Sequence, residues 1–534
     1  MKKWMTSIIF FTFSILLTVI LYMITEHNSI GVPLDTLSIE LTRGYQVRQI
    51  ITTVTVYLMG FILTAGICIN LKFYWIYFLA YPVGIATWCT TSLIVVMLGI
   101  PYRLGTMLLI FIPILAVMVL KIYKYNEMRS LSNVLHSLLY VTGIASIVSS
   151  GIFTIFLSFD SAYFIIQYGQ LLAEAGKIND SISVFLTWTG IMPALMSSLA
   201  TFCGFETIFV LHYLLIISFI GIFGVAVYEA LRNKMTKKKA QITASIVTGC
   251  LMIVPAFHLL AQFVIANTYF MIYMFLFIII AYKMGEQQAD NNSDYMLLLS
   301  LITIMLTMCR AEACTTVCFL IICISTLNIS NRKLLLSMVF PAGIIQIVYY
   351  VKVFLLEGNA GSELVNPKNV AIILGVWIMT LIYVVMFRNR IMKKIGNKIP
   401  VLMLVTLFAG NIILILLELE RAYINLDAEF YNVANEYWGY FPWIALLLCI
   451  IIIRYANNIS YFDLVWIGYI LFNFAICMGR FNDLRKGFGD SFNRMLIGVI
   501  PIFIFSVVVH MREYGHEKIE GKTKDEADYT NSML

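Results

Sequence analysis

The stretch WMTSIIFFTFSILLTVILYMI, residues 4–24, carries no charge and consists largely of aliphatic and aromatic side chains. A helix of about 20 such residues is long enough to cross the hydrocarbon core of a bilayer. The two lysines before it resemble the start of a signal peptide, but no small-residue cleavage motif follows, so we expect a retained first helix. The stretch therefore predicts a fold built in a membrane.

The composition of the whole chain supports the same interpretation. Hydrophobic residues make up 61% of the 534 residues and charged residues only 12%. A water-soluble domain does not need that much apolar surface, and no polar stretch is large enough for a separate soluble domain. We therefore predict an all-α fold, a polytopic transmembrane bundle of about 14–16 helices, some of them short.

Further apolar runs separated by polar breaks follow the first one along the chain. They cover 50–71, 73–98, 104–120, 134–158, 206–229, 241–263, 265–283, 334–355, 369–387, 400–419, 441–454, 463–479 and 495–511. Two shorter apolar pieces within 295–329 are joined by the sequence CRAEA. The chain is thus expected to cross the membrane many times.

Basic loops mark the cytoplasmic side of a membrane protein. They contain Lys121, Lys124 and Arg129; Arg232 and Lys237–Lys239; Arg332 and Lys333; Arg388, Arg390, Lys393, Lys394 and Lys398; and Arg512, Lys518 and Lys522 in the tail. The acidic and aromatic loops 159–183, 356–368 and 418–440 fall on the opposite side. The net charge of +7 comes from an excess of cations in the short basic loops on one side of the membrane. It therefore does not indicate nucleic-acid binding.

Residues 184–204 are long enough to cross the membrane, but one more crossing would place a basic cluster outside. Gly190, Pro193 and two serines disfavour a long helix. We therefore expect this segment to lie along the outer surface, as one of two interfacial helices in the first large outer loop.

The pieces within 295–329 have roughly 15 residues each, fewer than a crossing needs. A helical hairpin with its tip partway into the outer leaflet fits the length, and it brings Arg310 and Glu312 to membrane depth. One interpretation is a structural Arg310–Glu312 pair; the other is that both line a water-filled cavity.

The stretch FDSAYFIIQYGQLLAEAGK, residues 159–177, begins where a long apolar run ends. We expect a helix from Ser161 to Ala175, stopped by Gly176 in the left-handed conformation. Tyr163, Gln167, Gln170 and Glu174 recur at helical spacing and form a polar stripe on it. Asp160 either caps the start of this helix or serves as a catalytic carboxylate at the interface.

The last outer loop, MGRFNDLRKGFGDSFNRML at 478–496, is rich in cations, against the usual distribution of charge. Guanidinium groups of Arg485 and Arg494 match phosphate oxygens. The alternative is that these cations pair with Asp483, Asp490 and the acidic 418–436 loop, and that Arg494 reaches the interface from its helix start. The ten cysteines show no zinc-binding spacing, so no metal site is predicted.

These features together resemble the GT-C integral-membrane glycosyltransferases, which use polyprenyl-phosphate sugars. The similar features are a membrane helix that ends in an acidic residue (SFDSAYF, Asp160), a large outer loop with two interfacial helices, a mid-chain Arg-x-Glu (CRAEA), and a late helix start with Arg494. The resemblance covers about 134–510. Many family members carry two adjacent acidic residues in this loop, whereas Asp160 is followed by serine, which does not favour a metal-dependent mechanism.

The resemblance implies three parts: a four-helix transmembrane extension at 1–130, a catalytic module at 131–511 and a cytoplasmic polar tail at 512–534. It implies inverting sugar transfer on the outer face of the membrane, expected to be a bacterial plasma membrane. Asp160 would be the general base, and the substrate-binding residues would be Arg310, Glu312, Arg485, Arg494, Tyr163 and Gln167. The implied partners are a lipid-linked sugar donor, a saccharide, lipid or protein acceptor, and membrane lipids. No cofactor is expected; a divalent metal is compatible with the family but has no ligand pattern here.

Two other classes of protein fit the composition. A transporter or flippase for lipid-linked saccharides would show internal repeats and charges spread along a path, whereas this chain shows no repeat and its charges concentrate in outer loops. A polysaccharide polymerase would carry Arg-rich motifs in two large outer loops, but only the last loop is Arg-rich.

Overall fold

The structure is a computed structural model of the 534-residue chain. The residues that it describes are 2–25, 46–68, 71–124, 129–149, 162–177, 190–203, 207–232, 234–287, 292–310, 313–327, 332–357, 367–386, 395, 398–435, 437–455, 459–478, 483–487 and 491–511. The regular elements among these residues are all helices, with no β-strand, which confirms the predicted all-α fold.

The described residues include nine helices that are long and apolar enough to cross a membrane. α11 and α12 form a tenth candidate, a pair bent by 72° at a short break, and several shorter apolar helices of 10–17 residues accompany them. Because apolar helices of this length are stable in lipid rather than in water, the chain is a multi-pass membrane protein.

The chain divides into two compact units. The first contains α1 (Lys2–Thr25), α2 (Gln46–Ile67), α3 (Phe73–Met97), α4 (Leu104–Lys124), α5 (Arg129–Ser149), η2 (Ala162–Gln167), α7 (Tyr168–Ala175), α9 (Met192–Cys203), α13 (Ala266–Gln287), α14 (Asn292–Cys309), α16 (Arg332–Glu357) and α17 (Pro367–Met386). The second contains α11 (Lys237–Ile253), η3 (Ser325–Leu327), α19 (Ile399–Leu417), α20 (Leu419–Asn435), α21 (Phe441–Tyr455), α22 (Tyr461–Met478) and α23 (Ser491–Ile497), and a helix continues after α23 to residue 511.

The division between the units falls within three helices, α10 (Thr207–Arg232), α12 (Pro255–Gln262) and α15 (Ala313–Ile324). In the first unit, α1 packs against α5, and α2 packs against α3, α4 and α5. Of the first four helices, α1 and α2 are therefore in direct contact with α5, and the functional boundary expected at residue 130 stays a prediction.

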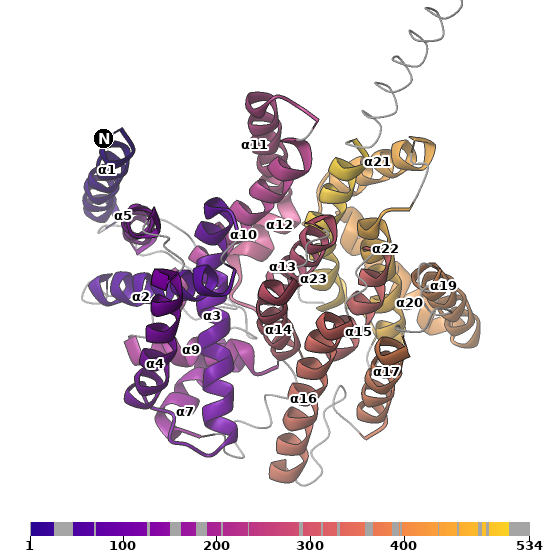
Figure 1. Cartoon of the computed structure of the whole chain (residues 1–534). Helices are drawn as coiled ribbons and strands as arrows, with labels where there is room; N and C mark the ends of the chain where they lie inside the picture. The colour runs from indigo at the N-terminus through magenta and orange to yellow at the C-terminus, as the bar shows by residue number, and fades with distance from the viewer. Residues whose placement is uncertain are drawn as a thin grey trace, which may run out of the picture. The chain divides into compact units, whose positions relative to one another are not determined.

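The helices of the first unit, drawn in Figure 1, differ in how far they are buried. α13 is the most enclosed of them, because 89% of its most apolar 18-residue stretch is buried. The corresponding share is 11% in α4 and 17% in α17. The exposed surfaces of α4 and α17 are aliphatic, including Leu109, Ile112 and Met379. Such surfaces are compatible with a hydrocarbon solvent and not with water.

α2 and α3 approach each other closely where two glycines meet. A Cβ on Gly60 would lie 1.7 Å from the carbonyl oxygen of Ala80, and one on Gly84 would lie 2.2 Å from that of Val56. Small residues permit such close contacts between membrane helices. Close packing matters in hydrocarbon because no hydrophobic driving force brings the helices together there. The two glycines therefore fix the α2–α3 crossing.

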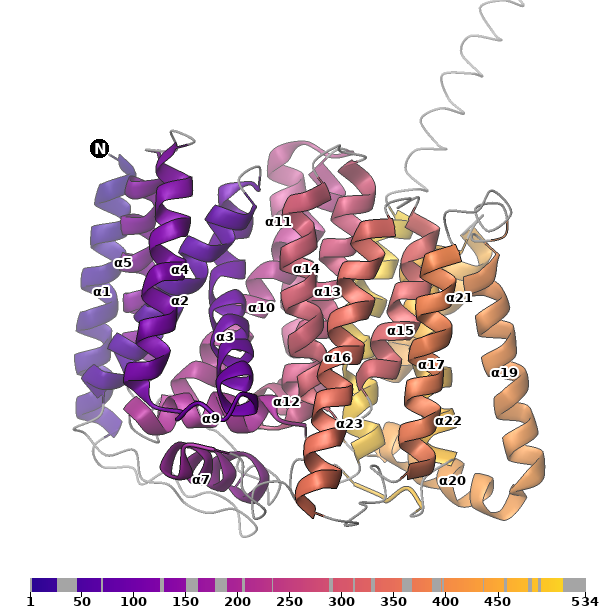
Figure 2. The ribbon, with the colours of Figure 1, turned by 60° about the horizontal axis from the view of Figure 1, so that its bottom comes forward.

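The segment 184–204 contains the helix α9, whose 12 residues are too few to cross the membrane. Figure 2 shows α7 and α9 across one end of the first unit, at the end opposite the N-terminus. The structure therefore supplies the two short helices predicted for this connection, and their position on the outer face of the membrane stays a prediction.

The second unit is arranged around α22. α19, which is largely exposed, packs against α22, and the Asn411 side-chain amide of α19 donates to the Leu471 carbonyl oxygen at 2.8 Å. α20 is amphipathic and lies across the ends of α19 and α22 (Figure 2). Its residues Leu419, Tyr423, Leu426 and Phe430 are exposed, as in a helix that rests at a membrane interface.

Candidate functional site

The predicted catalytic residue Asp160 lies outside the described residues, and so do Glu312 and the side chain of Tyr163. Their roles therefore stay predictions. The helix expected after Asp160 is present and ends as predicted. Gly176 has a φ of +67°, and its N–H donates to the Leu172 carbonyl at 2.9 Å.

The first six residues of this helix, η2, have π-helical hydrogen bonding before α7 continues as an α-helix. Short π-helical segments are rare and frequently occur at functional sites. Gln167 and Glu174 are exposed, whereas Ile165 and Leu172 are buried. Gln167 and Glu174 of the predicted polar stripe therefore point away from the protein interior.

α7 is held against α9 by close backbone packing. A Cβ on Gly169 would lie 2.3 Å from the Cβ of Ser197, so only glycine fits there. Tyr102, in the α3–α4 connection, contacts both α7 and α9. Its N–H donates to the carbonyl of Gly176, which follows α7, at 2.9 Å, and its hydroxyl lies 2.8 Å from Ser198 Oγ of α9. Burial raises the pKa of Tyr102 to about 12, so its hydroxyl stays protonated and neutral. Sequence reasoning missed this residue.

Arg310 is at the break between α14 and α15, where the sequence predicts the tip of a hairpin. Its side chain is only 6% exposed, and Nη1 donates to Asn267 Oδ1 at 3.2 Å. The backbone beside it contacts Gly190, whose φ is +75° and whose Cβ would lie 2.3 Å from the Met308 carbonyl oxygen. The chain that leads into α9 is therefore packed directly on the end of α14.

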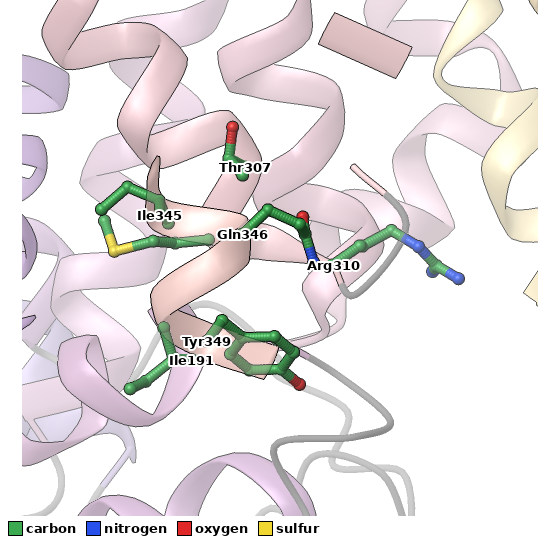
Figure 3. Close-up of a pocket in the computed structure, with 8 residues that line it drawn as sticks. Ile191, Thr307, Arg310, Ile345, Gln346 and Tyr349 are labelled. Atoms are coloured by element: carbon green, nitrogen blue, oxygen red, sulfur yellow. The ribbon is translucent and has the colours of Figure 1, made fainter. Parts of the chain in front are cut away.

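A small pocket adjoins this break (Figure 3), lined by Gly190, Ile191, Thr307, Met308, Arg310, Ile345, Gln346 and Tyr349. The guanidinium of Arg310 is directed away from Ile191 and Tyr349 in this view. The space open inside the pocket is about 10 Å³, which is about what one water molecule requires. A sugar does not fit in the pocket as it stands.

The predicted cations of the last loop lie in the second unit, beside α20. Asn425 and Asn432 are buried on α20 and bind the backbone of residues 483–487, here called the arginine loop. Asn425 Oδ1 accepts from the Leu484 N–H at 2.8 Å, and Asn432 Oδ1 accepts from the Gly487 N–H at 2.6 Å. The Asn432 amide also donates to the Arg485 carbonyl at 3.0 Å. Two asparagines two helical turns apart thus fix the path of this loop.

The side chains of the arginine loop differ in their partners. Lys486 pairs with Asp427 of α20 at 2.8 Å, and this hydrogen bond raises the pKa of the Lys486 ammonium group. Arg421 pairs with Asp483 at 3.3 Å. Arg485 is exposed and forms no ion pair with any residue that the structure describes. Ion pairing with the acidic loop therefore accounts for Lys486 but not for Arg485.

Arg494 is the fourth residue of α23, which begins at Ser491, earlier than the predicted helix start. Its side chain is 7% exposed, so it is enclosed by protein rather than extended into solvent, against the interfacial interpretation. The preceding Asn493 accepts a hydrogen bond from Trp438 Nε1 at 2.6 Å. A small apolar core joins α20, α22, the arginine loop and α23. It is formed by Ala428, Cys477, Leu484 and Phe492.

A second polar cluster in the same unit was not predicted. Ser460 and Asp463 form a reciprocal cap at the start of α22, because the Ser460 N–H donates to Asp463 Oδ2 at 2.8 Å and the Asp463 N–H donates to Ser460 Oγ at 3.2 Å. His510 Nε2 lies 2.7 Å from the same carboxylate, and Ser506 donates to its other oxygen. The carboxylate is thus fully occupied, and the cluster ties α22 to the last helix.

Arg310 belongs to the first unit, and Arg485 and Arg494 belong to the second. Their convergence on one cavity with Asp160 stays a prediction. Within the described residues, no group of three or more His, Cys, Asp or Glu side chains could hold a metal ion. Comparisons with protein-family models, with curated proteins and with solved structures find no match to this chain.

Proposed function

We propose that this protein is a membrane glycosyltransferase that moves a sugar, with inversion, from a polyprenyl-phosphate donor to an acceptor on the outer face of a bacterial plasma membrane. The contact of Gly190 with residues 308–310 supports this most strongly. It brings residue 190, which follows Asp160 in the α5–α10 connection, onto the end of α14, next to the buried Arg310. A carboxylate and a cation from these two segments are the pair of groups that such a transfer needs.

On this proposal, Asp160 accepts the proton of the acceptor hydroxyl as its oxygen bonds to the anomeric carbon. The bond from that carbon to the phosphate oxygen breaks, and its electron pair leaves with the lipid phosphate. Because attack and departure occur on opposite faces, the sugar is inverted. Arg310, Arg485 and Arg494 would hold the phosphate, since guanidinium groups form charge-assisted hydrogen bonds with its oxygens.

The remaining predicted residues would position the sugar and the acceptor. Gln167 is exposed on η2 and can present its amide to a hydroxyl group; Tyr163 and Glu312 are assigned the same task. The pocket beside Arg310 has space for about one water, so the donor would meet the guanidinium, which is directed away from Ile191 and Tyr349, from outside this pocket.

The test is sugar transfer by the full chain in nanodiscs, with a panel of radiolabelled polyprenyl-phosphate hexoses and pentoses. Asp160→Asn keeps the shape and capping ability of the side chain but cannot accept a proton. We expect it to bind the same donor while transfer falls by roughly 10²–10⁴-fold. Thermal unfolding of the same preparation is the control for folding.

Two results would contradict the proposal. One is an Asp160→Asn variant with the turnover of the unchanged chain. The other is movement of donor across the bilayer without sugar transfer, which would support a flippase.

A further inference from the structure

The first unit contains a cavity that the proposed function does not use. It lies among α1, α2, α3, α5 and α10 and has about 280 Å³ of open space. An apolar protein cavity of about 150 Å³ is large enough to bind benzene. The space is therefore large enough for a segment of an organic molecule, and it is far larger than the pocket beside Arg310.

Aromatic side chains form most of its wall. They are Phe10, Tyr57, Tyr77, Phe78, Tyr81 and Tyr140. The rings contact one another in sequence: the centroid of Tyr77 lies 6.0 Å from that of Tyr57 and 6.5 Å from that of Tyr140, and Tyr140 lies 4.8 Å from Phe10. Aromatic rings at such distances attract one another beyond the effect of their burial, and these contacts stabilise the wall around the space.

The depth of the cavity indicates which molecules can reach it. Tyr57, Tyr140 and Ser218 lie near the middle of α2, α5 and α10, whereas Tyr77 and Phe78 lie near the start of α3, so the cavity extends from mid-helix depth toward one end of the bundle. The midpoint of a membrane helix corresponds to the centre of the hydrocarbon core. Tyr57 and Tyr81 are buried, whereas Tyr140 and Ser218 are partly exposed, so the cavity has a closed floor and an accessible rim.

We propose that this cavity binds a hydrocarbon chain of a membrane lipid, either an acyl chain or an isoprenyl chain. An empty space of this size is disfavoured because protein interiors are close-packed. Water as the sole occupant is also disfavoured, because carbon atoms of aromatic and aliphatic side chains make up most of the wall, although four tyrosines and Ser218 contribute hydroxyl groups. A flexible chain that enters from the bilayer fills the space without bringing a charge to membrane depth. The proposal does not depend on the reaction that the protein catalyses.

The test is photolabelling of the full chain in nanodiscs with two probes. One is phosphatidylglycerol with a diazirine at the middle of an acyl chain, and the other is a polyprenyl phosphate with a diazirine in its isoprenoid chain. Adducts are located by mass spectrometry after digestion. We expect one of the probes to label the peptides that contain Tyr77 and Tyr140 several-fold more than the lipid-facing α4, and the preferred probe identifies the chain.

Variants that fill the cavity separate a site from general exposure to lipid. Ser218→Phe, and Ile217→Phe as a second variant, should each reduce labelling of the Tyr77 and Tyr140 peptides several-fold and leave labelling of α4 unchanged. Ser245→Phe, at an exposed position of α11, is the matched control and should change neither. Labelling that is no stronger than on α4 with both probes, or that persists in both filled variants, would overturn the proposal.

Discussion

Arg310 and Arg485 are both candidate phosphate ligands, but the protein holds them in opposite ways. Arg310 is 6% exposed, and its side chain is bonded to Asn267 inside the first unit. Arg485 is exposed, and what α20 binds is its backbone rather than its side chain. Burial makes the first charge costly to move and costly to remove. Exposure leaves the second able to meet a ligand at little cost.

The sharpest way to break this comparison is to remove the buried charge. Arg310→Leu leaves Asn267 without its cationic partner and takes away the proposed phosphate ligand. We expect transfer from the polyprenyl-phosphate donor to fall about 10²-fold, which is typical for the loss of one preorganised donor. Arg310→Lys should recover only part of this, since an ammonium group lacks the planar fork.

Donor binding and thermal unfolding are measured on the same Arg310 preparations. Equal turnover in Arg310→Leu and the unchanged chain would return Arg310 to a purely structural role. A loss of folded protein in both variants would also indicate that the role of Arg310 is structural.

The contact that places the α5–α10 connection on α14 gives the next largest effect. Gly190→Ala adds a Cβ 2.3 Å from the Met308 carbonyl oxygen, in a backbone conformation that alanine disfavours. We expect a loss of about 2–4 kcal/mol in unfolding free energy. Gly105→Ala is the control, because a Cβ there meets nothing within 4 Å and helical alanine is favourable. Equal thermal stability of the two variants would refute the packing at Gly190.

The asparagines of α20 come third. Asn425→Ala and Asn432→Ala each leave a loop N–H without its buried acceptor, at a cost of about 1–3 kcal/mol. Hydrogen exchange of residues 483–487 should become faster in both variants. Asn435→Ala, at an exposed position of the same helix, should leave exchange unchanged. Protection that persists in both variants would mean that something other than α20 holds the loop.

The smallest effect on the folded state is expected at the exposed arginine. Arg485→Gln should leave the unfolding temperature unchanged and weaken donor binding several-fold at low salt. The difference should shrink in 1 M salt, where the screening length falls to about 3 Å. Arg103→Gln, which also removes an exposed arginine, should not affect donor binding. An Arg485→Gln variant with unchanged affinity at low salt would remove this residue from the proposed site.

Local features of this fold could be predicted from the sequence. The apolar runs predicted the membrane helices, Gly176 predicted the end of α7, and the CRAEA motif predicted the break at Arg310. Each of these depends on neighbours within a few residues, through helix length, backbone conformation or capping. The predicted cation-rich loop was also found, although Lys486 proved to be paired with Asp427.

The tertiary pairings could not be predicted in the same way. Tyr102 meets Ser198 across 96 residues, Asp463 meets His510 across 47, and Asn432 meets the arginine loop across 53 to 55. A tyrosine between two helices or an asparagine on an amphipathic helix has no distinctive pattern in sequence, because its partner is chosen by packing. Only the Ser460-x-x-Asp463 cap had a recognisable local form.

The hydrogen bonds between α20 and the arginine loop determine which residues of this loop can be substituted. The hydrogen bonds that Asn425 and Asn432 form with the arginine loop all go to backbone atoms, those of Leu484, Arg485 and Gly487. The side chain of Arg485 contributes nothing to these bonds, whereas Lys486 adds an ion pair with Asp427, so position 485 can be exchanged while the loop keeps its path. The charge of the arginine loop can therefore change independently of the backbone hydrogen bonds that hold the loop on α20.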